Sequence, residues 1–142
     1  MIGLIVTGHG NFGSGLTSSL QLIAGEQESY QFVDFTKEVD ELREDLNNAM
    51  DALKDCEGIL VLSDLVGGSP FKTAVEVGFP RGNVEVVGGA NLPMLVEISM
   101  TRKFMTDATA QTLADAAVMT GKEQILRYEF KPVEQVASDD GI

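Results

Sequence analysis

The sequence predicts an α/β fold, in which a doubly wound, mostly parallel sheet carries helices on both faces. Residues 2–7 and 58–62 are short, continuous apolar runs, as expected of strands that are covered on both sides. Residues 37–54 place apolar side chains at spacings of three and four with charged residues between them, which is typical of an amphipathic helix. Because segments of the two kinds alternate along the chain, a parallel sheet is favoured.

The other elements follow in chain order. A helix is expected over residues 16–24 and a strand over 30–35, and Thr36 is a candidate N-cap for the helix over 37–54. A glycine-rich loop over 64–70 comes next, and Pro70 suits the first turn of a following helix. A strand is expected over 83–87, helices over 92–102 and 106–120, and a last strand over 125–130.

The chain has the size and composition of one globular domain. It has 142 residues, of which 44% are hydrophobic, enough for a single core without disulfide staples. No internal repeat or linker divides it. We expect the domain to cover residues 1–131, with residues 132–142 as a short flexible tail.

The charge balance disfavours two classes of partner. The chain has 22 acidic and 10 basic residues and a formal net charge of −12. Binding to nucleic acid needs clustered Lys and Arg, so no nucleic-acid partner is expected, and an anionic membrane surface is disfavoured for the same reason. A protein partner with a basic docking face would be attracted.

Neither a membrane span nor a disulfide framework is predicted. No apolar run approaches the ~18 residues that a span requires, so direct membrane insertion is not expected. The first residues lack a basic leader and are predicted to form a buried strand, which favours a cytoplasmic protein. The single cysteine, Cys56, lies between the acidic residues Asp55 and Glu57, which disfavour a reactive thiolate, so it is interpreted as a structural or incidental thiol.

Two loops are candidates for chemistry, because sites in open parallel sheets gather at the carboxyl ends of the strands. One contains His9, the only histidine, between Gly8 and Gly10. The other begins at Asp64, directly after the 58–62 strand. A neutral imidazole can attack phosphorus through one nitrogen while a carboxylate holds the proton on the other, and Asp64 is the candidate carboxylate. Backbone N–H groups and the start of the next helix would bind the phosphoryl oxygens; the candidates are Gly67, Gly68 and Ser69.

The two loops also allow other interpretations. A lone histidine is often an ordinary surface residue, and residues 64–70 could be only a tight turn. A dinucleotide site lacks its glycine fingerprint, and Asp34 is a weak candidate for a ribose-binding carboxylate. No Walker lysine follows Gly67, Gly68 and Ser69, and one histidine with one cysteine makes a poor metal site.

Five motifs in order resemble the enzyme IIA component of the mannose-type phosphoenolpyruvate-dependent sugar phosphotransferase system. The resemblance spans roughly residues 1 to 130, and its motifs lie at residues 7–10, 25–27, 34–35, 64–71 and 89–95. It implies that His9 accepts a phosphoryl group from the carrier protein HPr through Nε2, forming a phosphohistidine, and that Asp64 orients the ring. It also implies that the group passes to an enzyme IIB, and so to sugar arriving through a membrane permease, with neither metal nor organic cofactor.

The same resemblance implies a parallel sheet with a final antiparallel strand and a homodimer. In the mannose member that strand is exchanged between subunits, which draws attention to residues 125–130. This chain ends soon after the domain, so a separate IIB polypeptide is expected. It also carries Lys72 where the mannose member has Asn, and Lys72 is a candidate for tuning phosphate or partner contacts.

Two alternative functions remain at this point. One is the phosphoryl-donor subunit of a dihydroxyacetone kinase, which has a related fold. The other is a regulatory module whose histidine is phosphorylated only as a signal. The loop over 67–70 and the segment over 89–95 favour the sugar-uptake carrier.

Overall fold

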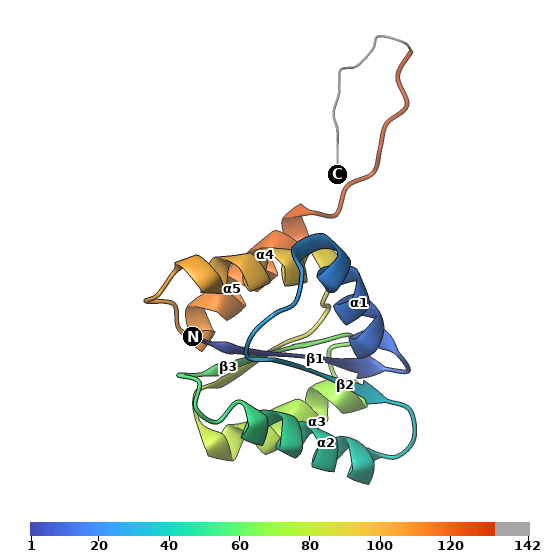
Figure 1. Cartoon of the computed structure of the whole chain (residues 1–142). Helices are drawn as coiled ribbons and strands as arrows, with labels where there is room; N and C mark the ends of the chain where they lie inside the picture. The colour runs from blue at the N-terminus through green and yellow to red at the C-terminus, as the bar shows by residue number, and fades with distance from the viewer. Residues whose placement is uncertain (133–142) are drawn as a thin grey trace.

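The computed structural model describes residues 1–132 and consists of a parallel sheet between two layers of helices (Figure 1). The strands lie in the order β2-β1-β3-β4, and every pairing is parallel. Helices α1, α4 and α5 cover one face, and α2 and α3 cover the other (Figure 1). The bounds are β1 Gly3–His9, α1 Phe12–Ala24, β2 Tyr30–Phe35, α2 Val39–Ala52, β3 Ile59–Ser63, α3 Ser69–Gly78, β4 Val84–Val87, α4 Leu92–Phe104 and α5 Ala110–Glu123, with a 3-10 turn over Phe79–Arg81.

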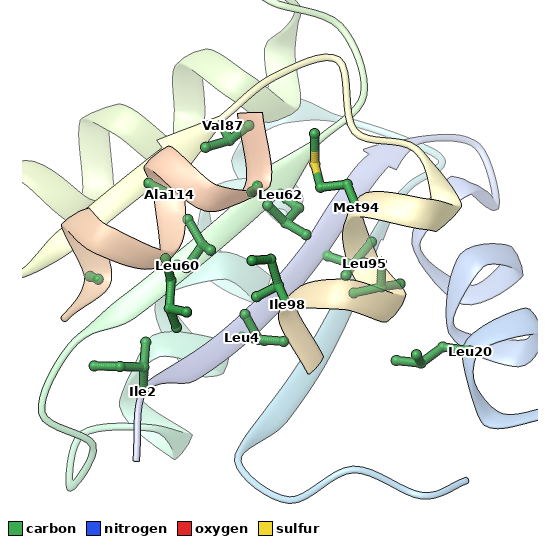
Figure 2. Packing of buried hydrophobic residues seen from close by; sticks show 14 residues of the cluster. Ile2, Leu4, Leu20, Leu60, Leu62, Val87, Met94, Leu95, Ile98 and Ala114 are labelled. Carbon is green, nitrogen blue, oxygen red and sulfur yellow. The ribbon is translucent and has the colours of Figure 1, made fainter. Parts of the chain in front are cut away.

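The alternation of side chains along the strands divides the interior into two cores. In β1, Leu4 and Val6 face α1, α4 and α5, whereas Ile5 faces α2 and α3. In β3, Leu60 and Leu62 join the first core and Val61 the second. Figure 2 shows the first core, where Leu4, Leu60 and Leu62 of the sheet meet Leu95 and Ile98 of α4. Both faces of β1 and β3 are therefore covered, as their continuous apolar runs predicted.

The parallel register brings the two candidate loops together. Thr7 of β1 lies opposite Ser63 of β3, and His9 lies opposite Phe35 of β2. The carboxyl ends of β1, β2 and β3 consequently meet at one edge of the sheet, the edge at which sites form in open α/β folds.

The predicted final antiparallel strand over residues 125–130 is wrong for the described chain. These residues form no strand and leave the body of the molecule after α5 (Figure 1). Their apolar side chains are exposed: Ile125, Leu126, Tyr128 and Phe130. A strand needs a neighbour to take its backbone hydrogen bonds, and within residues 1–132 this segment pairs with neither edge of the sheet.

Smaller differences concern the ends of helices. The helix expected over 16–24 begins earlier, at Phe12, and the helix expected over 106–120 runs from Ala110 to Glu123. Thr36 is not the N-cap of α2, because Glu38 has the extended backbone of that position and the helix begins at Val39. Of the tail predicted over residues 132–142, residues 133–142 lie outside the part of the chain that the structure describes.

Candidate functional site

His9 and Asp64 form a hydrogen-bonded pair at the carboxyl edge of the sheet. His9 is the last residue of β1, and Asp64 directly follows β3. The Nδ1 atom of His9 lies 2.7 Å from Oδ2 of Asp64, and the backbone N–H of His9 donates to the same oxygen at 2.8 Å. The other oxygen, Oδ1, accepts from the backbone N–H of Leu65 at 2.7 Å. The carboxylate therefore has a fixed orientation toward the ring.

This geometry decides which ring nitrogen faces outward. An ionised carboxylate only accepts hydrogen bonds, so in the neutral ring the proton resides on Nδ1 and Nε2 keeps its lone pair. The His9 side chain is 44% exposed, whereas that of Asp64 is 13% exposed. Partial burial raises the pKa of Asp64, but the bonds from the His9 backbone, the His9 ring and the Leu65 backbone outweigh it, and the pKa falls below its ordinary value. Asp64 thus stays ionised beside a partly exposed ring whose Nε2 keeps its lone pair.

The glycine-rich loop places the start of α3 beside the ring. Gly67 has a φ of 84°, in the left-handed region that favours glycine. A Cβ on Gly68 would lie 2.9 Å from Cε1 of His9, so the backbone passes as close to the ring as glycine allows. Helix α3 then begins at Ser69, with Pro70 in its first turn as expected.

The N–H groups at this helix start are not equivalent. That of Gly68 donates to the carbonyl of Leu65 at 3.0 Å, so this predicted phosphate donor is already engaged. Among residues 1–132, the N–H groups of Gly67, Ser69 and Phe71 donate to no protein acceptor. The first turn of α3 carries no acidic residue. An anion held at Nε2 of His9 would meet this helix end, where free N–H groups and the helix dipole favour negative charge.

A family model described as "PTS system fructose IIA component" matches residues 3–118, which include both loops and the whole sheet. The chain belongs to this enzyme IIA family. The PTS system mannose-specific EIIAB component of Escherichia coli K12 is 34% identical over 138 residues, covering 96% of this chain and 42% of the relative. The chain therefore spans less than half of that relative's length.

Two further relatives support the same membership. The PTS system fructose-specific EIIA component of Bacillus subtilis is 30% identical over 107 residues, covering 74% of this chain and 73% of the relative. The crystal structure of a phosphotransferase system component EIIA from Streptococcus agalactiae aligns with a TM-score of 0.80 at 33% identity, covering 89% of this chain and 97% of that one. The α/β fold class predicted from the sequence is confirmed by this likeness.

Within the enzyme IIA chain, Asp34 has a role that the sequence did not reveal. It lies near the end of β2, and its carboxylate accepts from Ser14, through the backbone N–H at 2.9 Å and the hydroxyl at 2.6 Å. Asn11, the N-cap residue of α1, makes no side-chain capping bond, so Asp34 caps that helix from a neighbouring strand. The interpretation of Asp34 as a ribose ligand does not fit a carboxylate occupied in this way.

Phe35 supports the histidine loop of the enzyme IIA chain from the same strand. Its carbonyl accepts the N–H of Gly10 at 2.8 Å, and its ring meets the His9 ring edge-on with centroids 5.6 Å apart. The sequence contains Asp34 and Phe35 as an adjacent pair, but it does not show that Asp34 binds Ser14 or that Phe35 contacts His9 and Gly10.

Two negative findings apply to the part of the enzyme IIA chain that the structure describes. Residues 1–132 contain no group of three or more His, Cys, Asp or Glu side chains arranged to hold a metal ion. None of the helices in this range combines the length and the apolar composition that crossing a membrane would need.

Proposed function

We propose that the protein is the phosphocarrier of a bacterial sugar-uptake system, in which His9 accepts a phosphoryl group from phospho-HPr and passes it to an enzyme IIB. The observation that carries the proposal is the bond between Nδ1 of His9 and Asp64, which leaves the lone pair of Nε2 free as the nucleophile on a side chain that is 44% exposed. Membership of the enzyme IIA family supports it and favours the sugar-uptake carrier over a dihydroxyacetone kinase subunit.

In the proposed transfer, Nε2 of His9 attacks phosphorus in line with the phosphorus–nitrogen bond of the donor phosphohistidine. A new nitrogen–phosphorus bond forms at Nε2 as the old one breaks, and its electron pair leaves with the donor nitrogen. The proton on Nδ1 stays on the ring, where the carboxylate of Asp64 stabilises the positive charge that develops. Positioning and electrostatic stabilisation supply most of the rate enhancement in such a step.

The phosphoryl oxygens would be bound at the start of α3 rather than at the start of α1. Both helices begin at this edge of the sheet, but the end of α1 already holds the carboxylate of Asp34. The start of α3 has no side-chain cap, and the N–H groups of Gly67 and Ser69 have no protein acceptor among residues 1–132. We therefore assign phosphate binding to Gly67 and Ser69, with Gly68 providing room for the ring.

The partners in this proposal are proteins. HPr is the donor, and an enzyme IIB, acting with a membrane permease, is the acceptor. We also propose a homodimer, because residues 125–130 carry exposed apolar side chains away from the body and the sheet ends at β4 among the described residues. The phosphohistidine would form in each subunit on its own His9.

The test is phosphorylation of the pure protein by phosphoenolpyruvate with enzyme I and HPr, followed by intact mass measurement and acid treatment. We expect an acid-labile phosphate on the wild type and none on His9→Ala. HPr that is visibly charged while the wild type stays unmodified would overturn the proposal. A charged protein that passes its phosphate to a dihydroxyacetone kinase subunit, and to no enzyme IIB, would favour the alternative function.

A further inference from the structure

Asn91 links two distant parts of the chain next to the site. It is partly buried between β4 and α4. Its Oδ1 accepts the N–H of Met94 at 3.1 Å and so caps α4, and its Nδ2 donates to the carbonyl of Gly121 near the end of α5 at 3.1 Å. Capping requires only the first of these bonds. The second bond fixes the end of α5 to the loop that follows β4.

That loop in turn holds the backbone of Asp64. The N–H of Gly89 donates to the carbonyl of Asp64 at 2.7 Å, and the N–H of Ala90 donates to the carbonyl of Ser63 at 2.9 Å. Ser63 is fully buried, so its carbonyl has little other freedom. The orientation of the Asp64 carboxylate toward His9 therefore depends on the position of Gly89 and Ala90, which directly precede Asn91.

Close packing makes this connection stiff. A Cβ on Gly121 would lie 2.6 Å from Cε of Met94, and a Cβ on Gly88 would lie 2.5 Å from Cγ2 of Val66 in the site loop. Interfaces packed this tightly transmit small shifts rather than absorb them. A groove of about 150 Å³ lies beside Asn91 and is lined also by Ile125, where the exposed segment over 125–130 begins.

We propose that Asn91 is a positioning residue for phosphoryl transfer, and that its bond to Gly121 makes the geometry of the His9–Asp64 pair depend on where α5 ends. The inference rests on the function proposed above. Asn91 touches neither His9 nor Asp64; it acts through Gly89 and Ala90. Residues 125–130 extend from the end of α5. A contact that holds this segment in place would therefore also affect the orientation of the His9 ring, through Gly121 and Asn91.

Two variants separate the bridge from the helix cap. Asn91→Asp keeps an oxygen for the Met94 N–H but loses the donor to Gly121 and sets a carboxylate against that carbonyl. Asn91→Ser also caps well but is too short to reach Gly121, and it adds no charge. The control is Thr109→Ala, which removes the capping bond from Thr112 N–H at the start of α5, at the amino ends of the strands and so away from the site.

The measurements are the rate of phosphoryl transfer from phospho-HPr, the ¹⁵N chemical shifts of the His9 ring and the thermal midpoint. We expect both Asn91 variants to transfer about 10-fold to 100-fold more slowly, as small misplacements of reacting groups do, with a changed proton distribution between Nδ1 and Nε2. Thr109→Ala should lower the midpoint and leave the rate and the ring shifts unchanged.

The inference is overturned if both Asn91 variants transfer at the wild-type rate, or if their ring shifts match the wild type whatever the rate. It is also overturned if Thr109→Ala slows transfer equally, because the effect would then be general loss of stability. Failure of the proposed function has a different signature, since the wild type itself would remain unphosphorylated by charged HPr.

Discussion

The carboxylate of Asp64 accepts two hydrogen bonds from His9 and one from the backbone of Leu65, besides a longer one of 3.4 Å from the hydroxyl of Ser63. Although partial burial opposes ionisation, the bonds from His9 and Leu65 hold the pKa of Asp64 below its ordinary value of 3.8. An aspartate in the unfolded chain has no such bonds. The carboxylate therefore stabilises the fold fully above the ordinary pKa, and this stabilisation is lost as the pH falls through the lower pKa of the folded protein.

We therefore expect Asp64→Asn to lower the free energy of unfolding at neutral pH. The amide carries no charge, and its NH₂ group would face the N–H donors of His9 or Leu65. The difference from the wild type should shrink as the solution is acidified below 3.8. Denaturant unfolding of both proteins across that range measures it. Asp55→Asn, at an exposed position, is the control and should show no such trend. A difference that grows on acidification would contradict the argument.

The position of a site residue was predictable where the sheet topology alone determines it. His9 and Asp64 each follow a strand, and parallel pairing of β1 with β3 necessarily brings those ends together. The capping role of Asp34 was not predictable, because Ser14 lies 20 residues away and no local pattern connects the two. The engaged N–H of Gly68 was likewise hidden, since the turn that occupies it appears only in the folded loop.

At the scale of the element, the start of α3 offers a test that separates the site from stability. Gly68 has φ −74° and ψ 170°, which any residue adopts, but an added Cβ meets the end of the His9 ring at 2.9 Å. Gly82, which follows the 3-10 turn before β4, has a φ of 73° with open space around it. We expect Gly68→Ala to slow phosphorylation of His9 with little loss of stability. Gly82→Ala should cost about 1–2 kcal/mol from backbone strain and leave the rate unchanged, because Gly82 precedes β4 and lies outside the phosphate site.

Phosphorylation rates and unfolding free energies of the two alanine variants measure this contrast. If Gly68→Ala transfers at the wild-type rate, the close approach of α3 to the ring has no part in the reaction. If Gly82→Ala slows transfer as much as Gly68→Ala does, the effect comes from lost stability and not from the contact with the ring.

Sequence periodicity predicts most of the helices and strands, and the differences at the helix ends have local causes. Helix α1 begins earlier than the sequence predicts. Gly13 and Gly15 disfavour a helix, but Asp34 caps the helix from a neighbouring strand and Gly13 permits its close approach. Helix α5 begins later than predicted, because Thr109 and Thr112 form a capping box that starts the helix at Ala110.

Across the whole molecule, Arg102 connects residues that lie far apart in the chain. Its side chain is 3% exposed and donates to the carbonyls of Ile2, Glu28 and Ser29, joining α4 to the start of β1 and to the turn before β2. We expect Arg102→Met to lower the free energy of unfolding by about 3 kcal/mol, because these carbonyls lose a charged donor. Arg102→Lys should not restore stability, since an ammonium lacks the planar fork.

Denaturant unfolding at neutral pH measures the Arg102 effect. The control is Arg43→Met, which breaks exposed ion pairs to Asp40 and Glu76 and should change stability much less. Equal losses in the two methionine variants would show that the buried bonds of Arg102 contribute nothing special.

The sequence predicted a parallel sheet, but it could not predict what residues 125–130 do. Side chains two residues apart in this segment do lie on the same side, as in a strand. Arg127 forms an ion pair with Glu129 at 3.1 Å, and the ring centroids of Tyr128 and Phe130 are 5.0 Å apart. The pattern indicates an extended segment without indicating what it pairs with. A second copy of the chain can supply the missing edge, which no pattern within one sequence can reveal.

The homodimer proposed here therefore depends on the apolar side chains of this segment. Leu126 is 87% exposed and Tyr128 is 70% exposed in the single chain, a state that water disfavours. We expect the wild type to sediment as a dimer and the double variant Leu126→Asp, Tyr128→Asp to sediment as a monomer, because a carboxylate buried at an interface without a partner is costly. Leu22→Asp, at a position 89% exposed on α1, is the matched control and should remain dimeric. A wild type that sediments as a monomer at all concentrations would leave the segment without a role in assembly, and dissociation of the Leu22 variant would move the interface to α1.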